Sequence, residues 1–203
     1  TTMERWVLLR KGADFEAIGK KYQISPRLAC LIRNRDVIGE EAVDRYLNGT
    51  ISDLYDGMLM KDMDKAIDIL KEKILEDKKI RVIGDYDIDG VNATYILLEG
   101  LERLGADVDS DIPDRISDGY GLNRHLVERA YEAGVDTLIT CDNGIAAADE
   151  IAYGKEMGMT VIVTDHHEIP FEDTERGRNY KLPPADAIIN PKQPDCAYPN
   201  KNI

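Results

Sequence analysis

The sequence predicts an α/β domain with a mostly parallel β-sheet, helices on both faces of the sheet, and a short helical arm in front. Short runs rich in Val and Ile alternate with amphipathic segments of about 10 to 15 residues, the pattern of strands joined by crossover helices. Such connections give right-handed βαβ units with parallel strands. The 203 residues, 43% of them hydrophobic, are enough for one full domain with a sizeable core.

Residues 1–60 are expected to form the helical arm. Ser25-Pro26 places an N-cap residue before a proline at the first helical position, which predicts a helix over 27–35. A second helix is expected over 39–47, closed by Asn48-Gly49. Because so few residues make a poor independent core, we favour a packing arm over a free-standing helical module.

Residues 61–203 are expected to hold the sheet. An amphipathic helix over 62–79 comes first, because apolar residues recur there at helical spacing. Strands and helices then alternate. The expected strands cover 80–84, 106–112, 135–141, 159–164 and 186–189, and the expected helices between them cover 91–104, 123–133 and 145–157.

Composition excludes several classes of protein. No stretch approaches the roughly 18 apolar residues of a membrane span, and the first ten residues lack the layout of a secretory signal. The three cysteines are widely spaced and form no CxxC pair, which disfavours a disulfide framework or a zinc knuckle. We therefore expect a soluble cytoplasmic protein with no membrane partner.

The net charge of −13 is unevenly distributed. Residues 1–81 hold 16 Lys and Arg against 15 Asp and Glu, whereas residues 82–203 hold 10 against 24. A uniformly acidic surface would disfavour nucleic acid, which binds basic surfaces. Here the excess of acidic residues lies in the part of the chain that carries the sheet, so we examine which side chains follow its strands.

Acidic and imidazole side chains follow three of the expected strands. The segments are Asp85-Tyr86-Asp87-Ile88-Asp89-Gly90, Cys141-Asp142-Asn143-Gly144 and Asp165-His166-His167-Glu168. Open α/β sheets bind ligands beyond the carboxyl ends of their strands, near a topological switch point. Five or more carboxylates at one end of a sheet repel one another strongly unless cations or protons compensate them, and divalent metal ions are the natural compensation. The sequence therefore predicts a divalent-metal site.

Each of these residues also has a structural interpretation when taken alone. An Asp before Gly90, or before Asn143-Gly144, can simply cap a helix or turn the chain. His125, inside an expected helix, is expected to be structural, and Cys141, inside a strand, to be a small core residue. Adjacent imidazoles at 166 and 167 can instead serve a metal and a substrate oxygen. This donor set suits Mn²⁺, Mg²⁺ or Fe²⁺, and zinc less distinctively.

A glycine-containing loop, RISDGYGLN at 115–123, follows the second strand. Gly119 and Gly121 permit close backbone approach, and the start of a helix offers N–H groups to an anion. Arg115 can make bidentate contacts to a phosphate. A plain glycine turn before a helix is the alternative.

Four motifs, in this order and on these strand ends, resemble the DHH phosphoesterase superfamily. They are GDYDIDG at 84–90, ISDGYGLN at 116–123, TCDNGI at 140–145 and TDHHE at 164–168. Two flanking segments, KDMDKAI at 61–67 and ADAIINPKQPDCAYPNKN at 185–202, are similar to the RecJ-type single-strand-specific exonucleases within that superfamily.

The resemblance implies a 5′-to-3′ exonuclease that acts on single-stranded DNA in recombination and repair, with two Mn²⁺ or Mg²⁺ ions. Carried over to this sequence, Asp85 and Asp87 would each ligate a metal ion. Asp142 would bridge the two ions and His166 would ligate the second one.

The resemblance also assigns roles around the metal ions. His167 would face the scissile phosphate. Independently of the resemblance, we expect His167 and Arg115 to neutralise the non-bridging phosphate oxygens. Asp89 and Asp165 would hold the loops, as hydrogen-bonded outer shells do around metal ligands. Some superfamily members have a His shortly before the first Asp, and 81–84 offers none here.

The family carries a further metal-binding Asp and a second, DNA-clasping domain beyond the matching segment. We therefore expect an N-terminal fragment, a monomer, that turns over poorly or not at all by itself. The sequence identifies no protein partner.

Two other functions stay open. A DHH phosphodiesterase could act on short oligonucleotides or cyclic dinucleotides, or hydrolyse pyrophosphate. A catalytically inactive DHH scaffold could bind repair or replication partners. Its metal ligands would then be expected to be eroded, whereas the residues present here are Asp85, Asp87, Asp142, Asp165, His166 and His167.

Overall fold

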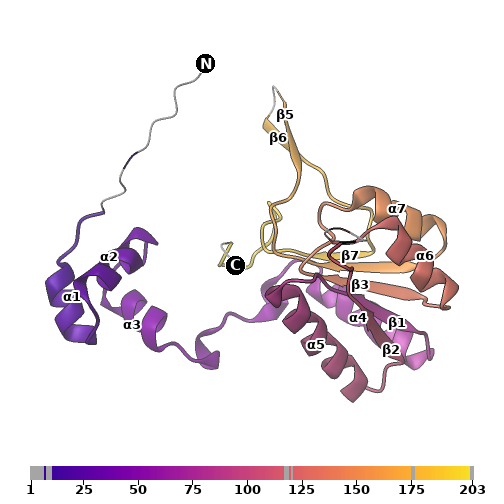
Figure 1. The fold of residues 1–203 in the computed structure, drawn as a ribbon, viewed down its shortest axis with the longest axis horizontal. Coiled ribbons are helices and arrows are strands. Elements are labelled where there is room, and N and C mark those ends of the chain that lie inside the picture. Colours follow the sequence, from indigo (N-terminus) through magenta and orange to yellow (C-terminus); the bar gives the residue numbers. More distant parts are fainter. Residues whose placement is uncertain (1–6, 8–10, 117–118, 120, 175–176, 202–203) are drawn as a thin grey trace. The chain divides into compact units, whose positions relative to one another are not determined.

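The computed structural model describes residues 7, 11–116, 119, 121–174 and 177–201. It divides the chain into two compact units, Thr1–Leu54 and Tyr55–Ile203 (Figure 1). The domain boundary between residues 60 and 61 stays a prediction.

The first unit contains three short helices. They are α1 (Phe15–Tyr22), α2 (Pro26–Asn34) and α3 (Glu40–Asn48), followed by the 3₁₀ turn η1 (Ile51–Asp53). Ser25 caps α2 as expected, because its hydroxyl oxygen accepts a hydrogen bond from the backbone N–H of Leu28 at 3.2 Å. We did not predict α1, which Asp14 caps by accepting from Ala17 N at 2.9 Å.

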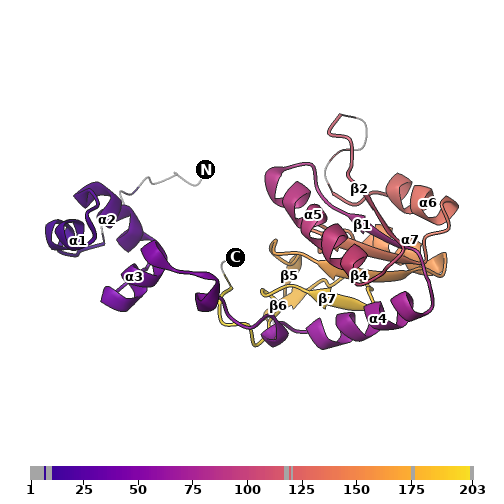
Figure 2. The same ribbon diagram turned by 90° about the horizontal axis from the view of Figure 1, so that it is seen from below.

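The second unit contains a five-stranded parallel sheet, which confirms the predicted fold class (Figures 1 and 2). Its strands are β1 (Ile80–Ile83), β2 (Val108–Asp111), β3 (Thr137–Cys141), β4 (Thr160–Thr164) and β7 (Ala187–Ile189). The strand order is β2-β1-β3-β4-β7, and every neighbouring pair is parallel. Because the order reverses between β1 and β3, the carboxyl ends of these two strands form the topological switch point.

Helices cover both faces of this sheet. They are α4 (Met63–Leu75), α5 (Ile88–Arg103), α6 (Arg124–Glu132) and α7 (Ala148–Glu156), and the 3₁₀ turn η2 (Gly57–Leu59) precedes α4. Helix α5 begins three residues before the expected start at 91, because Asp87 caps it. Helix α7 begins three residues after the expected start at 145.

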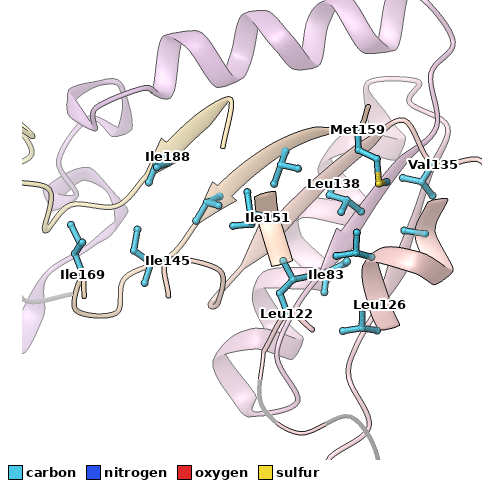
Figure 3. Packing of buried hydrophobic residues seen from close by; sticks show 14 residues of the cluster. Ile83, Leu122, Leu126, Val135, Leu138, Ile145, Ile151, Met159, Ile169 and Ile188 are labelled. Atoms are coloured by element: carbon cyan, nitrogen blue, oxygen red, sulfur yellow. The ribbon is translucent and has the colours of Figure 1, made fainter. Parts of the chain in front are cut away.

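Two hydrophobic clusters form the core, one on each face. Successive side chains of a strand point to opposite faces, so Leu138 joins one cluster and Ile139 the other. The first cluster packs strand residues against α6 and α7 through Leu126, Val127 and Ile151 (Figure 3). The second packs strand residues against α4 and α5, and includes Ala66 and Leu101.

An antiparallel hairpin that we did not predict stands between β4 and β7. Its strands are β5 (Phe171–Thr174) and β6 (Gly177–Tyr180), and both are exposed along their whole length. It is visible as a separate two-stranded element in Figure 1. Since neither strand is buried, the segment lacks the alternation of apolar and polar residues by which a half-buried strand is recognised.

All three cysteines are free thiols, which confirms that no disulfide framework is present. Within the part of the chain that the structure describes, no helix is both long enough and apolar enough to cross a membrane.

Candidate metal centre

The predicted site residues lie where the strands β1, β3 and β4 end. These three strands are parallel neighbours in the sheet, so the loops that follow them meet at one end of it. Two groups of side chains there have ligand atoms that all lie within 4.8 Å of one another. One group is Asp85, Asp87 and Asp142, and the other is Asp142, His166 and His167. Asp142 belongs to both.

Asp85 is a fully buried carboxylate at the end of β1. Its exposed fraction is 0%, and neither of its oxygens has a hydrogen-bond partner within the described residues. An isolated buried carboxylate is very unfavourable, because burial removes its hydration without replacement. The charge of Asp85 therefore has to be compensated by a cation or a proton, because the described side chains supply no partner.

Two glycines bring the start of α5 against Asp85. A Cβ atom on Gly90 would lie 2.5 Å from the backbone N and O of Asp85. A Cβ atom on Gly84 would lie 1.9 Å from Oγ1 of Thr94, which itself donates to Gly90 O at 2.7 Å. Only glycine allows so close an approach of helix and strand end.

Asp87 is the N-cap of α5. Its Oδ1 accepts hydrogen bonds from Gly90 N at 3.0 Å and from Asp89 N at 2.9 Å. The N–H of Gly90 is the main reason why the pKa of the Asp87 carboxyl lies below its ordinary value. Asp87 thus caps a helix and is also grouped with Asp85 and Asp142. The capping role of Asp87 was not predicted, and it applies together with the predicted place of Asp87 in the ligand group.

Asp142 occupies a left-handed backbone conformation with φ of 60° at the end of β3. Its Oδ1 lies 2.8 Å from Nε2 of His166, and its Oδ2 is buried without a hydrogen-bond partner in the described structure. Burial, and then the negative charge of Asp87, raise the pKa of the Asp142 carboxyl. With the two oxygens of Asp85, this makes three buried carboxylate oxygens that have no donor among the described residues.

Asp165 holds both histidines in place. Its Oδ1 accepts from the backbone N–H groups of His166 at 2.7 Å and His167 at 3.0 Å, and its Oδ2 accepts from Ile145 N at 2.9 Å. The same Oδ1 lies 2.7 Å from Nδ1 of His167. A carboxylate can only accept, so Nδ1 carries the proton and Nε2 is the nitrogen that acts as base or ligand.

Asp89 differs from Asp165. It is exposed in the first turn of α5, and its carboxylate makes no hydrogen bond with the described residues. Of the two aspartates that we predicted to support the loops, only Asp165 makes contacts with His166 and His167.

The glycine loop is described only in part, because Ser117, Asp118 and Tyr120 of the motif lie outside the described residues. The guanidinium of Arg115 lies 5.2 Å from the ring centroid of Tyr86, which places it beside the Asp85 loop. Gly119 and Gly121 both have positive φ, 80° and 72°.

Gly121 and His167 line a cavity of about 310 Å³. Helix α6 begins after this loop, and Asn123 caps it by accepting from Leu126 N at 3.0 Å. We expected the N–H groups at this helix N-terminus to be available to an anion, but the N–H of Leu126 is hydrogen-bonded to the Asn123 side chain.

Cys141 is a core residue, as expected. It is 2% exposed and belongs to the cluster packed against α4 and α5. Burial raises the pKa of its thiol to about 11. A protonated thiol is a poor metal ligand, so the donor set at neutral pH consists of carboxylates and imidazoles.

We did not identify Asn143, Thr140 or Thr164 from the sequence. Asn143 donates to two backbone carbonyls, Thr140 Oγ1 donates to Asn143 O at 2.8 Å, and Thr164 Oγ1 donates to Thr140 O at 2.7 Å. The available signal was the Asn-Gly pair after Asp142, which also fits an ordinary turn.

A parallel α/β domain with a carboxylate and imidazole centre at its switch point defines a class of metal-dependent α/β proteins. Residues 79–198 match the model of the DHH family, N-terminal domain, and the chain belongs to this family.

Curated relatives share sequence with almost the whole chain. This chain is 39% identical over 200 residues to the single-stranded-DNA-specific exonuclease RecJ of Bacillus subtilis. The match covers 98% of this chain and 24% of that protein. It is 36% identical to RecJ of Haemophilus influenzae, covering 92% of this chain and 30% of that protein. The chain thus spans about a quarter to a third of the length of these relatives.

Solved structures agree with the fold. The crystal structure of an exonuclease RecJ bound to manganese has a TM-score of 0.60 and 36% identity, covering 70% of this chain and 34% of that one. RecJ from Thermus thermophilus in complex with Mn²⁺ also has a TM-score of 0.60, with 29% identity over 95% of this chain and 26% of that one.

Proposed function

We propose that this chain is the metal-binding part of an exonuclease that removes nucleotides from the 5′ end of single-stranded DNA, with Mn²⁺ or Mg²⁺ as cofactor. The observation that carries the proposal is the buried Asp85, whose two oxygens lack hydrogen-bond partners beside Asp87 and Asp142. The RecJ relatives and the manganese-bound structures support the substrate and the metal. The polarity rests on the family resemblance.

The residues fit two divalent cations. Asp85, Asp87 and Asp142 would hold one ion, and Asp142 and His166 the other, with Asp142 shared. Such ions lower the pKa of a bound water and stabilise charge on the attacking and leaving oxygens of a phosphodiester. No protein nucleophile is needed for this reaction.

The chain's own residues orient the substrate. Asp165 holds the proton on Nδ1 of His167, so that Nε2 faces the scissile phosphate. Arg115, fixed beside Tyr86, neutralises a non-bridging phosphate oxygen. Gly119 and Gly121 let the loop backbone approach the substrate. Asp89, with Asp165, would support the loops, and its backbone N–H already joins Asp87 to α5.

We place the complete protein in DNA repair and recombination in the cytoplasm, as a monomer acting on single-stranded DNA. Phosphodiesterase action on short oligonucleotides or cyclic dinucleotides, pyrophosphatase action and an inactive scaffold are the less favoured functions. The relatives are named for single-stranded-DNA-specific exonuclease activity, and Asp85, Asp87, Asp142, His166 and His167 are present and grouped here.

The proposal is tested by digestion of DNA labelled at its 5′ or 3′ end, single-stranded or double-stranded, with Mn²⁺ or Mg²⁺. The enzyme would be this chain completed to the length of its relatives. We expect loss of the 5′ label from single strands only, and loss of activity in Asp142→Ala. Full activity of Asp142→Ala would contradict the shared-ligand role, and hydrolysis of cyclic dinucleotides or pyrophosphate in place of DNA would contradict the substrate.

A further inference from the structure

Asn143 joins the ends of the two strands that carry different ligand candidates. Its side chain is 3% exposed, and Nδ2 donates to Ile83 O at 3.1 Å and to Cys141 O at 3.0 Å. Ile83 ends β1 two residues before Asp85, and Cys141 ends β3 directly before Asp142. One amide group therefore spans the topological switch point between the two carboxylates.

The orientation of this amide is fixed by its hydrogen bonds. A side-chain amide has two N–H donors, and both are used for the two carbonyl groups. Rotation of the amide by half a turn would place its oxygen against two carbonyl oxygens. Oδ1 is buried and has no partner within the described residues. An unpaired buried acceptor is unfavourable, because burial removes its hydration without replacement.

The backbone around Asn143 is equally constrained. Asp142 and Gly144 on either side have positive φ, 60° and 105°. Thr140 Oγ1 binds the carbonyl oxygen of Asn143, and a Cβ on Gly144 would lie 2.4 Å from this same Oγ1. The loop turns so sharply that the Asn143 side chain points back across the ends of β1 and β3.

We propose that Asn143 is a positioning residue that sets the separation of Asp85 and Asp142, and thereby the affinity of the centre for a divalent cation. The inference rests on the proposed function, because it requires these two carboxylates to share a metal site. It assigns part of the metal affinity to an amide that belongs to neither group of candidate ligands. Loss of a partner that orients metal ligands typically lowers metal affinity about 10- to 100-fold.

The test is calorimetric titration of the chain with Mn²⁺, for the wild type and the variants Asn143→Asp, Asn143→Ala and Asn143→Ser. Asp has the size of Asn but no N–H donor, Ala removes the side chain's polar atoms, and Ser keeps one donor. We expect about 10- to 100-fold weaker Mn²⁺ binding for Asp and Ala. Ser is expected to lose less.

Gln193 supplies the matched control. It is also a buried amide, 1% exposed, and its Nε2 donates to Ile188 O at 2.7 Å, but it belongs to neither ligand group. Gln193→Ala should lower the free energy of unfolding in urea without changing the Mn²⁺ affinity. A merely structural Asn143 would behave in the same way.

Wild-type Mn²⁺ affinity in a folded Asn143 variant would overturn the inference and leave the metal centre standing. So would an equal loss of affinity in Gln193→Ala, because the effect would then be general loosening. If Asp and Ala do not fold, the milder Ser variant is judged by the same criterion. No Mn²⁺ binding by the wild type would instead contradict the metal centre itself, and the inference with it.

Discussion

The three aspartates grouped at the carboxyl-terminal end of the parallel sheet are balanced differently from Asp136 and Asp109, and also from Asp111, which ends β2 and pairs with Arg129. At the amino-terminal end of β3, Asp136 Oδ1 lies 2.8 Å from Nζ of Lys73. On β2, Asp109 lies 2.6 Å from Nε of Arg81 and 3.1 Å from Nζ of Lys79. At the carboxyl-terminal end, in the described part of the chain, no Lys or Arg pairs with any of the three grouped aspartates.

The carboxyl pKa values follow this difference. Burial opposes ionisation of Asp136 and Asp109, but their basic partners outweigh it and hold both pKa values below the ordinary value. The pKa of Asp142 is raised by burial and by the charge of Asp87. An aspartate at a strand end is thus not a metal ligand by virtue of its position. The grouped aspartates are distinguished by having no Lys or Arg partner among the described residues, so that a cation from solution can compensate them.

Replacing one aspartate at each end of the sheet by asparagine should give the largest difference in Mn²⁺ affinity. Asp85→Asn removes the charge with little change in shape, and we expect Mn²⁺ binding to weaken by more than the roughly 100-fold that an orienting partner contributes. Asp136→Asn should leave the Mn²⁺ affinity at the wild-type value. Calorimetric titration of both variants measures the contrast, and a normal Mn²⁺ affinity of Asp85→Asn would remove the basis for the metal centre.

The same two variants should change stability in opposite directions when no metal is present. Asp85→Asn removes an unpaired buried charge and should raise the free energy of unfolding by about 1 to 3 kcal/mol. Asp136→Asn leaves Lys73 without its partner and should lower it by about 1 kcal/mol. Urea unfolding in the presence of a chelator checks both signs. Equal signs would mean that the two ends of the sheet do not differ in charge compensation.

Two glycines of α5, Gly90 and Gly100, allow the effect of close backbone packing to be measured separately from the effect of helix propensity. In Gly90→Ala the new Cβ meets the Asp85 backbone, so we expect a loss of about 1 to 3 kcal/mol in stability and weaker Mn²⁺ binding. Gly100→Ala is the control in the same helix, because nothing lies within 4 Å of its Cβ. It should gain about 0.5 to 1 kcal/mol and bind Mn²⁺ normally. A Gly90→Ala variant as stable as Gly100→Ala would show that the α5 start can move away from Asp85.

The ends of the strands were predictable from sequence because buried parallel strands are apolar runs, and the first polar residue after each run is easily recognised. Asp85, Asp142 and His166 were found in this way, and the structure brings them together. The start of α5 was placed too late because Asp87 was considered as a ligand and not also as its cap.

Two other features required the three-dimensional structure. The β5–β6 hairpin is exposed along its whole length, so it leaves no periodic pattern in the sequence. Asn143 acts on Ile83, 60 positions earlier in the chain, and that contact exists only because β1 and β3 are neighbours in the sheet. Sequence patterns identify the residues at the end of a strand, whereas partners across the switch point depend on strand order.

Acid titration tests the amino-terminal end by itself. The folded-state pKa values of Asp136 and Asp109 are lowered from 3.8, so as pH falls the unfolded chain takes up protons first. The stability that these two carboxylates contribute is therefore present above that value and lost as pH falls through their folded pKa values. For the metal-free chain we expect a loss of about 1 kcal/mol from this source between about pH 5 and pH 3.

Asp136→Asn should show a smaller loss in urea unfolding. Asp68→Asn, at an exposed position of α4, should keep the wild-type pH dependence. Identical curves for Asp136→Asn and the wild type would mean that the Lys73 pair does not compensate this end of the sheet, and the contrast between the two ends would then rest on Asp109 alone.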